Sequence, residues 1–195
     1  IRDRYLNVEY LGLQSLYSNF CDVLSFAYFG AGTAMLFSFY GPLARGDKER
    51  LAAIYRHYDG IYKKMTCVVL GIGSISTIFA VFSVNASISD LEVAVTYLTF
   101  MLSVVLYNRQ MVRNYFIQAD QRRYFVAAVT GGVDASALII EILLLKYFKS
   151  YEAFVVCILV KNILINWIFG KYLKIRYGYL FKSCLLYTSP SPRDR

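Results

Sequence analysis

Long apolar runs, separated by short polar segments, organise almost the whole chain. A helix needs roughly 20 apolar residues to cross the hydrocarbon core of a bilayer. Segments such as Met65–Val84 and Phe154–Phe169 show almost no polar face, which a water-soluble helix of that length would carry. The pattern predicts an all-α fold, a polytopic bundle of about five transmembrane helices. The predicted spans run over about 12–40, 65–84, 93–117, 124–146 and 152–172.

Composition supports this class: 57% of the residues are hydrophobic, and the mean hydropathy is +0.45. The net charge of +8 is also typical of a nucleic-acid-binding domain. No motif of that class is present, and such a domain would not place its surface in bilayer-length apolar runs. We therefore expect no nucleic-acid partner.

Basic residues fall unequally on the two sides of the predicted membrane. If the first span descends from the outside, the segments 41–64, 107–124 and 171–183 face the cytoplasm and hold 14 basic residues, whereas the opposite segments hold 4. An excess of Lys and Arg marks cytoplasmic loops. The chain is thus predicted to be a multi-pass protein of a cell membrane, with these three segments cytoplasmic.

Residues 184–195 (CLLYTSPSPRDR) have nothing in common with the sequence before them. They resemble one translated reading frame of a transposase-type sequencing adapter, although their Pro-Ser-Pro pattern is alternatively typical of a disordered linker. We treat this tail as non-native and leave it out of the fold. Without it the net charge falls from +8 to +7. Because the chain also lacks an initial methionine, we expect residues 1–183 to be an internal fragment of a longer protein.

Turn and packing signals divide the first half of the chain. Gly41-Pro42 is expected to end the first span, because proline cannot continue the helical hydrogen-bond ladder. Asp47 is expected to cap an amphipathic cytoplasmic helix over 47–64 that leads into the second span. Small residues in the first span, and Gly71 and Gly73 in the second, predict close packing between helices inside a bundle.

Four ionisable residues lie inside the predicted spans: Asp22, Asp134, Glu141 and Lys161. Each costs about 2.5–3.5 kcal/mol or more on insertion scales, so each needs water or a partner. With 1.5 Å per residue, Asp134 and Lys161 lie about 15 Å from the cytoplasmic ends of neighbouring antiparallel helices, which favours an ion pair. Asp22 and Glu141 are expected at a similar, more outward depth.

These charges admit two interpretations. In one, they line a hydrophilic lumen with Arg109 at its inner mouth; in the other, the Asp134–Lys161 pair only fixes helix packing. Arg109 and Arg113 are alternatively interfacial anchors that set the topology. The cysteines in the spans have no metal-ligand spacing, so neither a metal nor a cofactor is expected.

A resemblance sharpens the functional expectation. The segment 27–50, AYFGAGTAMLFSFYGPLARGDKER, resembles the Wzx-type polysaccharide flippases, and the similarity extends to 11–19 and 117–121. These flippases belong to the MOP superfamily, together with the MATE exporters and the MurJ-type lipid II flippases. Over about 1–183 the resemblance implies helices two to six of a larger transporter, most of its N-terminal lobe.

The resemblance implies a function in a bacterial inner membrane. The protein would translocate undecaprenyl-pyrophosphate-linked oligosaccharide units by alternating access, for lipopolysaccharide or other surface polysaccharide biosynthesis. It would not be an enzyme; its partners would be membrane lipids, a polysaccharide polymerase and glycosyltransferases. Lys161 and Arg109 would attract the pyrophosphate, and Asp22, Asp134 and Glu141 would accept a coupling proton or sodium.

Some positions depart from the family pattern. Tyr28 stands where the family has an acid, so no role of that acid carries over, and the three acids in the spans stand where relatives often have Ser, Asn and Gln. Two other classes of function stay open. One is a cation-coupled exporter or lipid II flippase of the same fold, and the other is a non-transporting scaffold of polysaccharide synthesis.

Overall fold

A computed structural model describes residues 12, 14–19, 22, 31–83, 89–147 and 151–181. No strand occurs among them, so the predicted all-α bundle is confirmed. The elements are α2 (Ala31–Arg45), α3 (Lys48–Ser83), α4 (Asp90–Ala119), α5 (Arg123–Tyr147), α6 (Tyr151–Arg176) and the short 3₁₀ helix η3 (Gly178–Phe181). The predicted tail, 184–195, lies outside the described residues.

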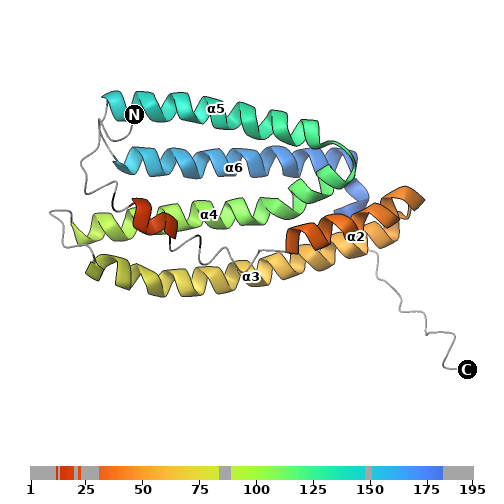
Figure 1. Ribbon diagram of the computed structural model, residues 1–195, viewed down its shortest axis with the longest axis horizontal. Helices are drawn as coiled ribbons and strands as arrows, with labels where there is room; N and C mark the ends of the chain where they lie inside the picture. The colour runs from red at the N-terminus through yellow and green to blue at the C-terminus, as the bar shows by residue number, and fades with distance from the viewer. Residues whose placement is uncertain are drawn as a thin grey trace, which may run out of the picture.

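The four long helices lie side by side in the order α5, α6, α4, α3, and α2 packs against α3 and α4 (Figure 1). Helix α4 occupies the centre of this arrangement and buries large side chains along its whole length, among them Tyr97, Met101, Val112 and Phe116. Helix α5 touches chiefly α6 and buries only Val126, Ala137 and Leu145. Helix α6 thus lies between the central helix α4 and the peripheral helix α5.

Four of the described helices are long and apolar enough to cross a membrane, as expected of a multi-pass membrane protein. Helices α4, α5 and α6 match the last three predicted spans to within a few residues. The first predicted span, 12–40, is described only in part: residues 12, 14–19 and 22 are helical, and the helix described from Ala31 forms its end.

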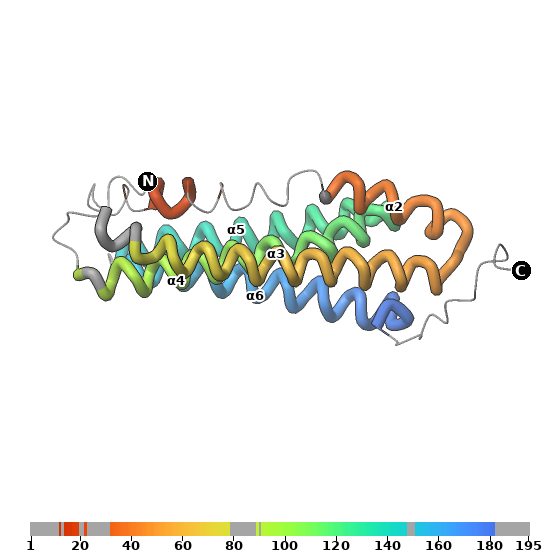
Figure 2. The backbone as a smooth tube through the Cα atoms, turned by 90° about the horizontal axis from the view of Figure 1, so that it is seen from below, coloured from red at the N-terminus to blue at the C-terminus, as the bar shows by residue number. Residues whose placement is uncertain are grey.

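The second span continues directly from the amphipathic segment that was expected to lead into it. The amphipathic segment 47–64 and the span 65–84 form one continuous helix, α3, of 36 residues. The junction between them contains neither proline nor glycine, so nothing interrupts the hydrogen-bond ladder. Helix α3 is about 54 Å long, well beyond the roughly 30 Å of a hydrocarbon core. With α2 it forms a hairpin that extends past the other helices (Figure 2).

The end of α2 also differs from the prediction. The helix continues through Gly41-Pro42 to Arg45, with Pro42 inside it. Proline removes one hydrogen-bond donor, but its fixed φ is compatible with a helix. Helix α2 instead ends at Gly46, whose φ of +67° a residue with a side chain rarely adopts. The Gly46 and Asp47 amides donate to the carbonyls of Leu43 and Pro42, the hydrogen bonds of a Schellman cap.

The predicted cap of α3 is confirmed. The backbone N–H of Arg50 donates to Oδ1 of Asp47 at 3.0 Å, and the N–H of Leu51 donates to the Asp47 carbonyl. Asp47 therefore satisfies an amide that would otherwise lack a partner in the first turn.

Close packing at the glycines is confirmed at some positions only. A Cβ at Gly32 would lie 2.5 Å from the ring of Tyr115, and a Cβ at Gly73 would overlap Met101, so α2 and α3 both approach α4 closely. Gly71 has nothing within 4 Å of such a Cβ. The outer face of α2 is open, with Phe37 70% exposed, so α2 is packed on one side and is not an interior helix.

The three segments predicted to be cytoplasmic gather at one end of the bundle, which we call the basic end. It comprises the α2–α3 turn, the α4–α5 turn and the residues after α6. Aromatic side chains join them: Phe116 of α4 packs edge-on against Tyr55 of α3 and against Tyr177, which follows α6. The arrangement agrees with the topology that the basic residues predict.

Candidate functional site

The structure contains the predicted ion pair. Nζ of Lys161 on α6 lies 3.2 Å from Oδ1 of Asp134 on α5. The side chain of Lys161 is 25% exposed and that of Asp134 is 53% exposed. We call these two residues the α5–α6 ion pair. Its charges satisfy each other, and the carboxylate also stays open to its surroundings.

The antiparallel packing of α5 on α6 sets this pair at mid-span. Near the basic end, the ring of Phe125 stacks on Tyr172 with 4.2 Å between centroids, which fixes the register of the two helices. From Arg123 to Asp134 the rise along α5 is about 16 Å, close to the middle of a roughly 30 Å hydrocarbon core. The pair therefore lies where an exposed charge is most costly.

Glu141 lies on the same side of α5, two turns further from the basic end. Cys157, one turn before Lys161 on α6, lies within the electrostatic range of both Glu141 and Lys161. Two acids and one lysine are thus spaced along a single α5–α6 contact. Of the five site residues predicted from the sequence, the structure brings these three onto one pair of helices.

The other two predicted residues lie elsewhere. Arg109 is exposed on α4, and with Arg113 it acts electrostatically on the hydroxyl of Tyr55 on α3. Asp22 is an exposed helical residue in the part of the chain before α2. Neither is among the described contacts of Asp134 or Lys161, so their membership of one lumen stays a prediction.

A second polar region, which we call the α4–α6 seam, joins the other face of α6 to α4. Nδ2 of Asn162 donates to the carbonyl of Ser103 at 3.1 Å, and Nδ2 of Asn166 donates to the carbonyl of Leu106 at 2.7 Å. Nη1 of Arg113 donates to the Asn166 carbonyl at 2.7 Å. These bonds tie the middle of α6 to α4 between Ser103 and Arg113.

The seam was missed in the sequence, although a signal for it exists. Asn162 and Asn166 are spaced by four residues in an otherwise apolar run, so they share one helical face. Helix α4 also buries Asn108 and Gln110. Nδ2 of Asn108 and Oε1 of Gln110 have no hydrogen-bond partner among the described residues. Amide side chains inside a predicted span indicate contacts between helices. The amides of α4 and those of α6 therefore mark the two helices that the seam joins.

A third polar cluster closes the basic end. Asp120 accepts hydrogen bonds from Arg122, at 3.0 Å, and from the hydroxyl of Tyr177. Arg122 also donates to the Tyr172 hydroxyl at 3.2 Å. Burial, with the hydrogen bond to Asp120 second, raises the pKa of Tyr177 well above its ordinary value. Arg122 thus joins the α4–α5 turn to α6.

Among the described residues, no group of three or more His, Cys, Asp or Glu side chains could hold a metal ion. The cysteines that the structure describes, Cys67 and Cys157, are free thiols.

Comparison of the chain with protein-family models, with curated proteins and with solved structures gave no match. The inferences about function therefore rest on the sequence and on the geometry of the sites.

Proposed function

We propose that the protein is a membrane transporter of the polysaccharide flippase kind, which moves undecaprenyl-pyrophosphate-linked oligosaccharides across a bacterial inner membrane by alternating access. The observation that carries this proposal is the α5–α6 ion pair. Its Asp134 side chain is 53% exposed at mid-span, where a purely structural pair has no reason to keep a carboxylate open to its surroundings. A water-filled translocation path lowers the cost of that exposure. The resemblance of residues 27–50 to these flippases supports the same assignment.

In this mechanism Lys161 offers a positive charge to the anionic pyrophosphate, and Asp134 competes with the substrate for the ammonium group. The lysine would exchange partners as the substrate passes. The exchange frees the Asp134 carboxylate, and Glu141, two turns further along α5, provides a second acid, so that either can accept a coupling proton or sodium from the surroundings.

Deleting the gene from its host and restoring it on a plasmid tests the substrate class. The proposal predicts loss of surface polysaccharide and accumulation of the lipid-linked repeat unit on the cytoplasmic side of the membrane. Restoration with the wild-type gene should reverse both effects. Normal polysaccharide together with increased sensitivity to cationic drugs would instead identify an exporter.

A scaffold is distinguished by a second experiment. A scaffold needs the protein at the membrane, but it does not need a charge at mid-span. A Lys161→Met variant that is present at normal levels and still restores polysaccharide would contradict the transport role. Loss of the polysaccharide at normal protein levels supports it, and Lys174→Met, which removes an exposed lysine at the end of α6, is the matched control.

A further inference from the structure

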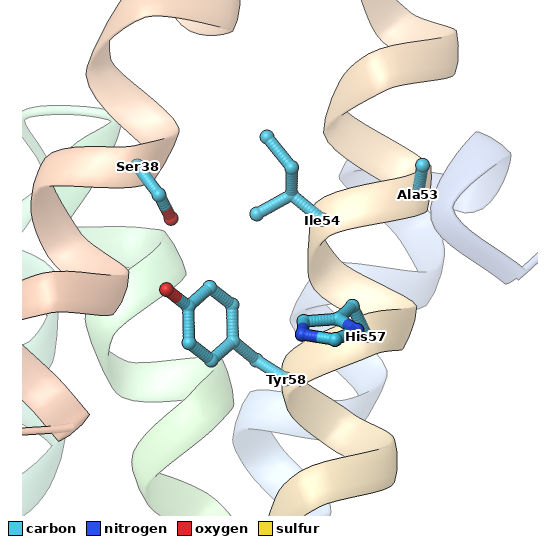
Figure 3. A pocket seen from close by; sticks show the side chains of 5 residues that line it. All are labelled: Ser38, Ala53, Ile54, His57 and Tyr58. Atoms are coloured by element: carbon cyan, nitrogen blue, oxygen red, sulfur yellow. The ribbon is translucent and has the colours of Figure 1, made fainter.

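A cavity opens between α2 and α3, on a different face of the molecule from the α5–α6 ion pair. Its volume is about 460 Å³, and it is lined by Ser38, Ala53, Ile54, His57 and Tyr58. Figure 3 shows the hydroxyls of Ser38 and Tyr58 directed into the space between the two helices, with the imidazole of His57 beside them. The Ser38 hydroxyl donates to the Met35 carbonyl at 2.7 Å, which leaves its oxygen able to accept a hydrogen bond.

The cavity lies at the depth where lipid headgroups meet the protein. The ring of Tyr58 lies 6.3 Å from that of Phe39, which packs at 5.2 Å on Phe116. Phe116 belongs to the last turn of α4, which ends at Ala119. The end of a membrane-spanning helix marks the boundary between hydrocarbon and headgroups, where hydroxyl-bearing aromatic side chains are also favoured.

The space between α2 and α3 becomes basic toward the α2–α3 turn. A second, smaller cavity of about 120 Å³ is lined by Gly41, Pro42, Arg45, Asp47 and Arg50. Both arginines are exposed. Each lies two helical turns from a residue of the first cavity and on the same face of its helix: Arg45 follows Ser38 on α2, and Arg50 precedes His57 on α3. The Asp47 carboxylate is engaged in capping α3, because it accepts the Arg50 amide. The two cavities, which together we call the groove, therefore offer two guanidinium groups at the end near the α2–α3 turn and two hydroxyls further along the same two helices.

We propose that this groove binds the phosphate headgroup of an anionic phospholipid. Arg45 and Arg50 would contact the phosphate, since guanidinium groups match phosphate oxygens in charge and geometry. The hydroxyls of Ser38 and Tyr58 would contact the glycerol and ester oxygens. Exposed Phe37, beside the groove on α2, extends an apolar surface along which an acyl chain lies, and this favours a lipid over a free phosphate ion.

Native mass spectrometry of the purified protein tests the proposal, with phosphatidylglycerol and phosphatidylcholine added in equal amounts. The wild-type protein should retain phosphatidylglycerol in preference. The variant Arg45→Gln/Arg50→Gln should bind it at least about tenfold more weakly, the loss expected for about 1.4 kcal/mol of interaction. Ser38→Ala/Tyr58→Phe, which keeps the ring packed on Phe39, should lose about threefold.

The matched control is Arg123→Gln/Lys174→Gln, which removes two exposed charges from the same end of the bundle but outside the groove. It should bind phosphatidylglycerol like the wild type. Equal retention of both lipids by the wild type, or an equal loss in the control, would overturn the proposal. Displacement of the lipid by excess inorganic phosphate would identify a free-anion site, and that result also overturns it.

Discussion

Helix α6 carries polar side chains on two faces. The two faces differ in how far their polar groups are exposed. Toward α4, Asn162 and Asn166 donate to carbonyls and lie in the packed interface, and Arg113 closes the seam. Toward α5, Lys161 meets an acid whose side chain is 53% exposed. The first face holds two helices together. The second leaves the carboxylate of Asp134 open at mid-span, as the proposed transport role requires.

The largest expected effect on stability comes from breaking the seam. Arg113→Met leaves the Asn166 carbonyl without its charge-assisted donor between two packed helices. We expect a loss of about 2 kcal/mol, seen in detergent as a fall in Tm of about 4–8 °C. Lys161→Met, which also removes one cation, should lower Tm by less than half as much, because water can solvate the exposed Asp134. Equal falls in Tm would contradict the claim that the α4–α6 seam stabilises the protein more than the α5–α6 ion pair does.

Two glycines give a smaller and more local comparison. A Cβ at Gly170 would lie 3.0 Å from Nη1 of Arg113 in the seam, whereas nothing lies within 4 Å of a Cβ at Gly132, near the ion pair. Gly132→Ala should stabilise α5 by about 0.5–1 kcal/mol through its helix propensity. In Gly170→Ala this gain should be cancelled, because the guanidinium must move. Thermal unfolding measures both variants, and an equal gain at Gly170 would show that the seam tolerates displacement.

The smallest effect concerns the cluster at the basic end and depends on pH. The pKa of Tyr177 is raised above the ordinary value of 10.0. Its neutral hydroxyl therefore contributes stability below about pH 10, and this contribution is lost as the pH rises through the raised pKa. Tyr177→Phe should lower Tm slightly at pH 7 and flatten its decline above pH 10. Tyr124→Phe, at an exposed tyrosine, is the control, and the same flattening there would contradict the assignment to Tyr177.

The sequence predicts the helices better than it predicts their ends. Apolar length places α4, α5 and α6 correctly, because the bilayer imposes that length. Pro42 misled the prediction because its fixed φ is compatible with a helix and α2 continues past it to Arg45, where Gly46, with its positive φ, provides the actual end. The amphipathic segment 47–64 was expected to lead into the second span, and the two lie in one helix because a change from polar to apolar residues alters the environment of a helix without interrupting it.

For the site, the sequence predicts a contact only where the residues are charged and their depths in the membrane can be compared. Asp134 and Lys161 could be paired from their depths, since antiparallel neighbours with short connections share a register. The position of Arg109 depends on which helices α4 contacts, and no periodicity gives that. Asn162 and Asn166 are uncharged, so a search for ionisable groups in the spans does not find them. They nevertheless bind α4 most directly.

The most direct test of the transport role replaces both charges at once. Asp134→Leu/Lys161→Met removes the α5–α6 ion pair without leaving either charge alone, so the helices should still pack and the protein should reach the membrane at normal levels. The measurement is surface polysaccharide in a host strain that carries only this variant. The proposed transport role predicts that the polysaccharide is lost while the Tm of the purified variant stays within a few degrees of the wild type. Wild-type polysaccharide in that strain would contradict it and leave the pair a packing contact.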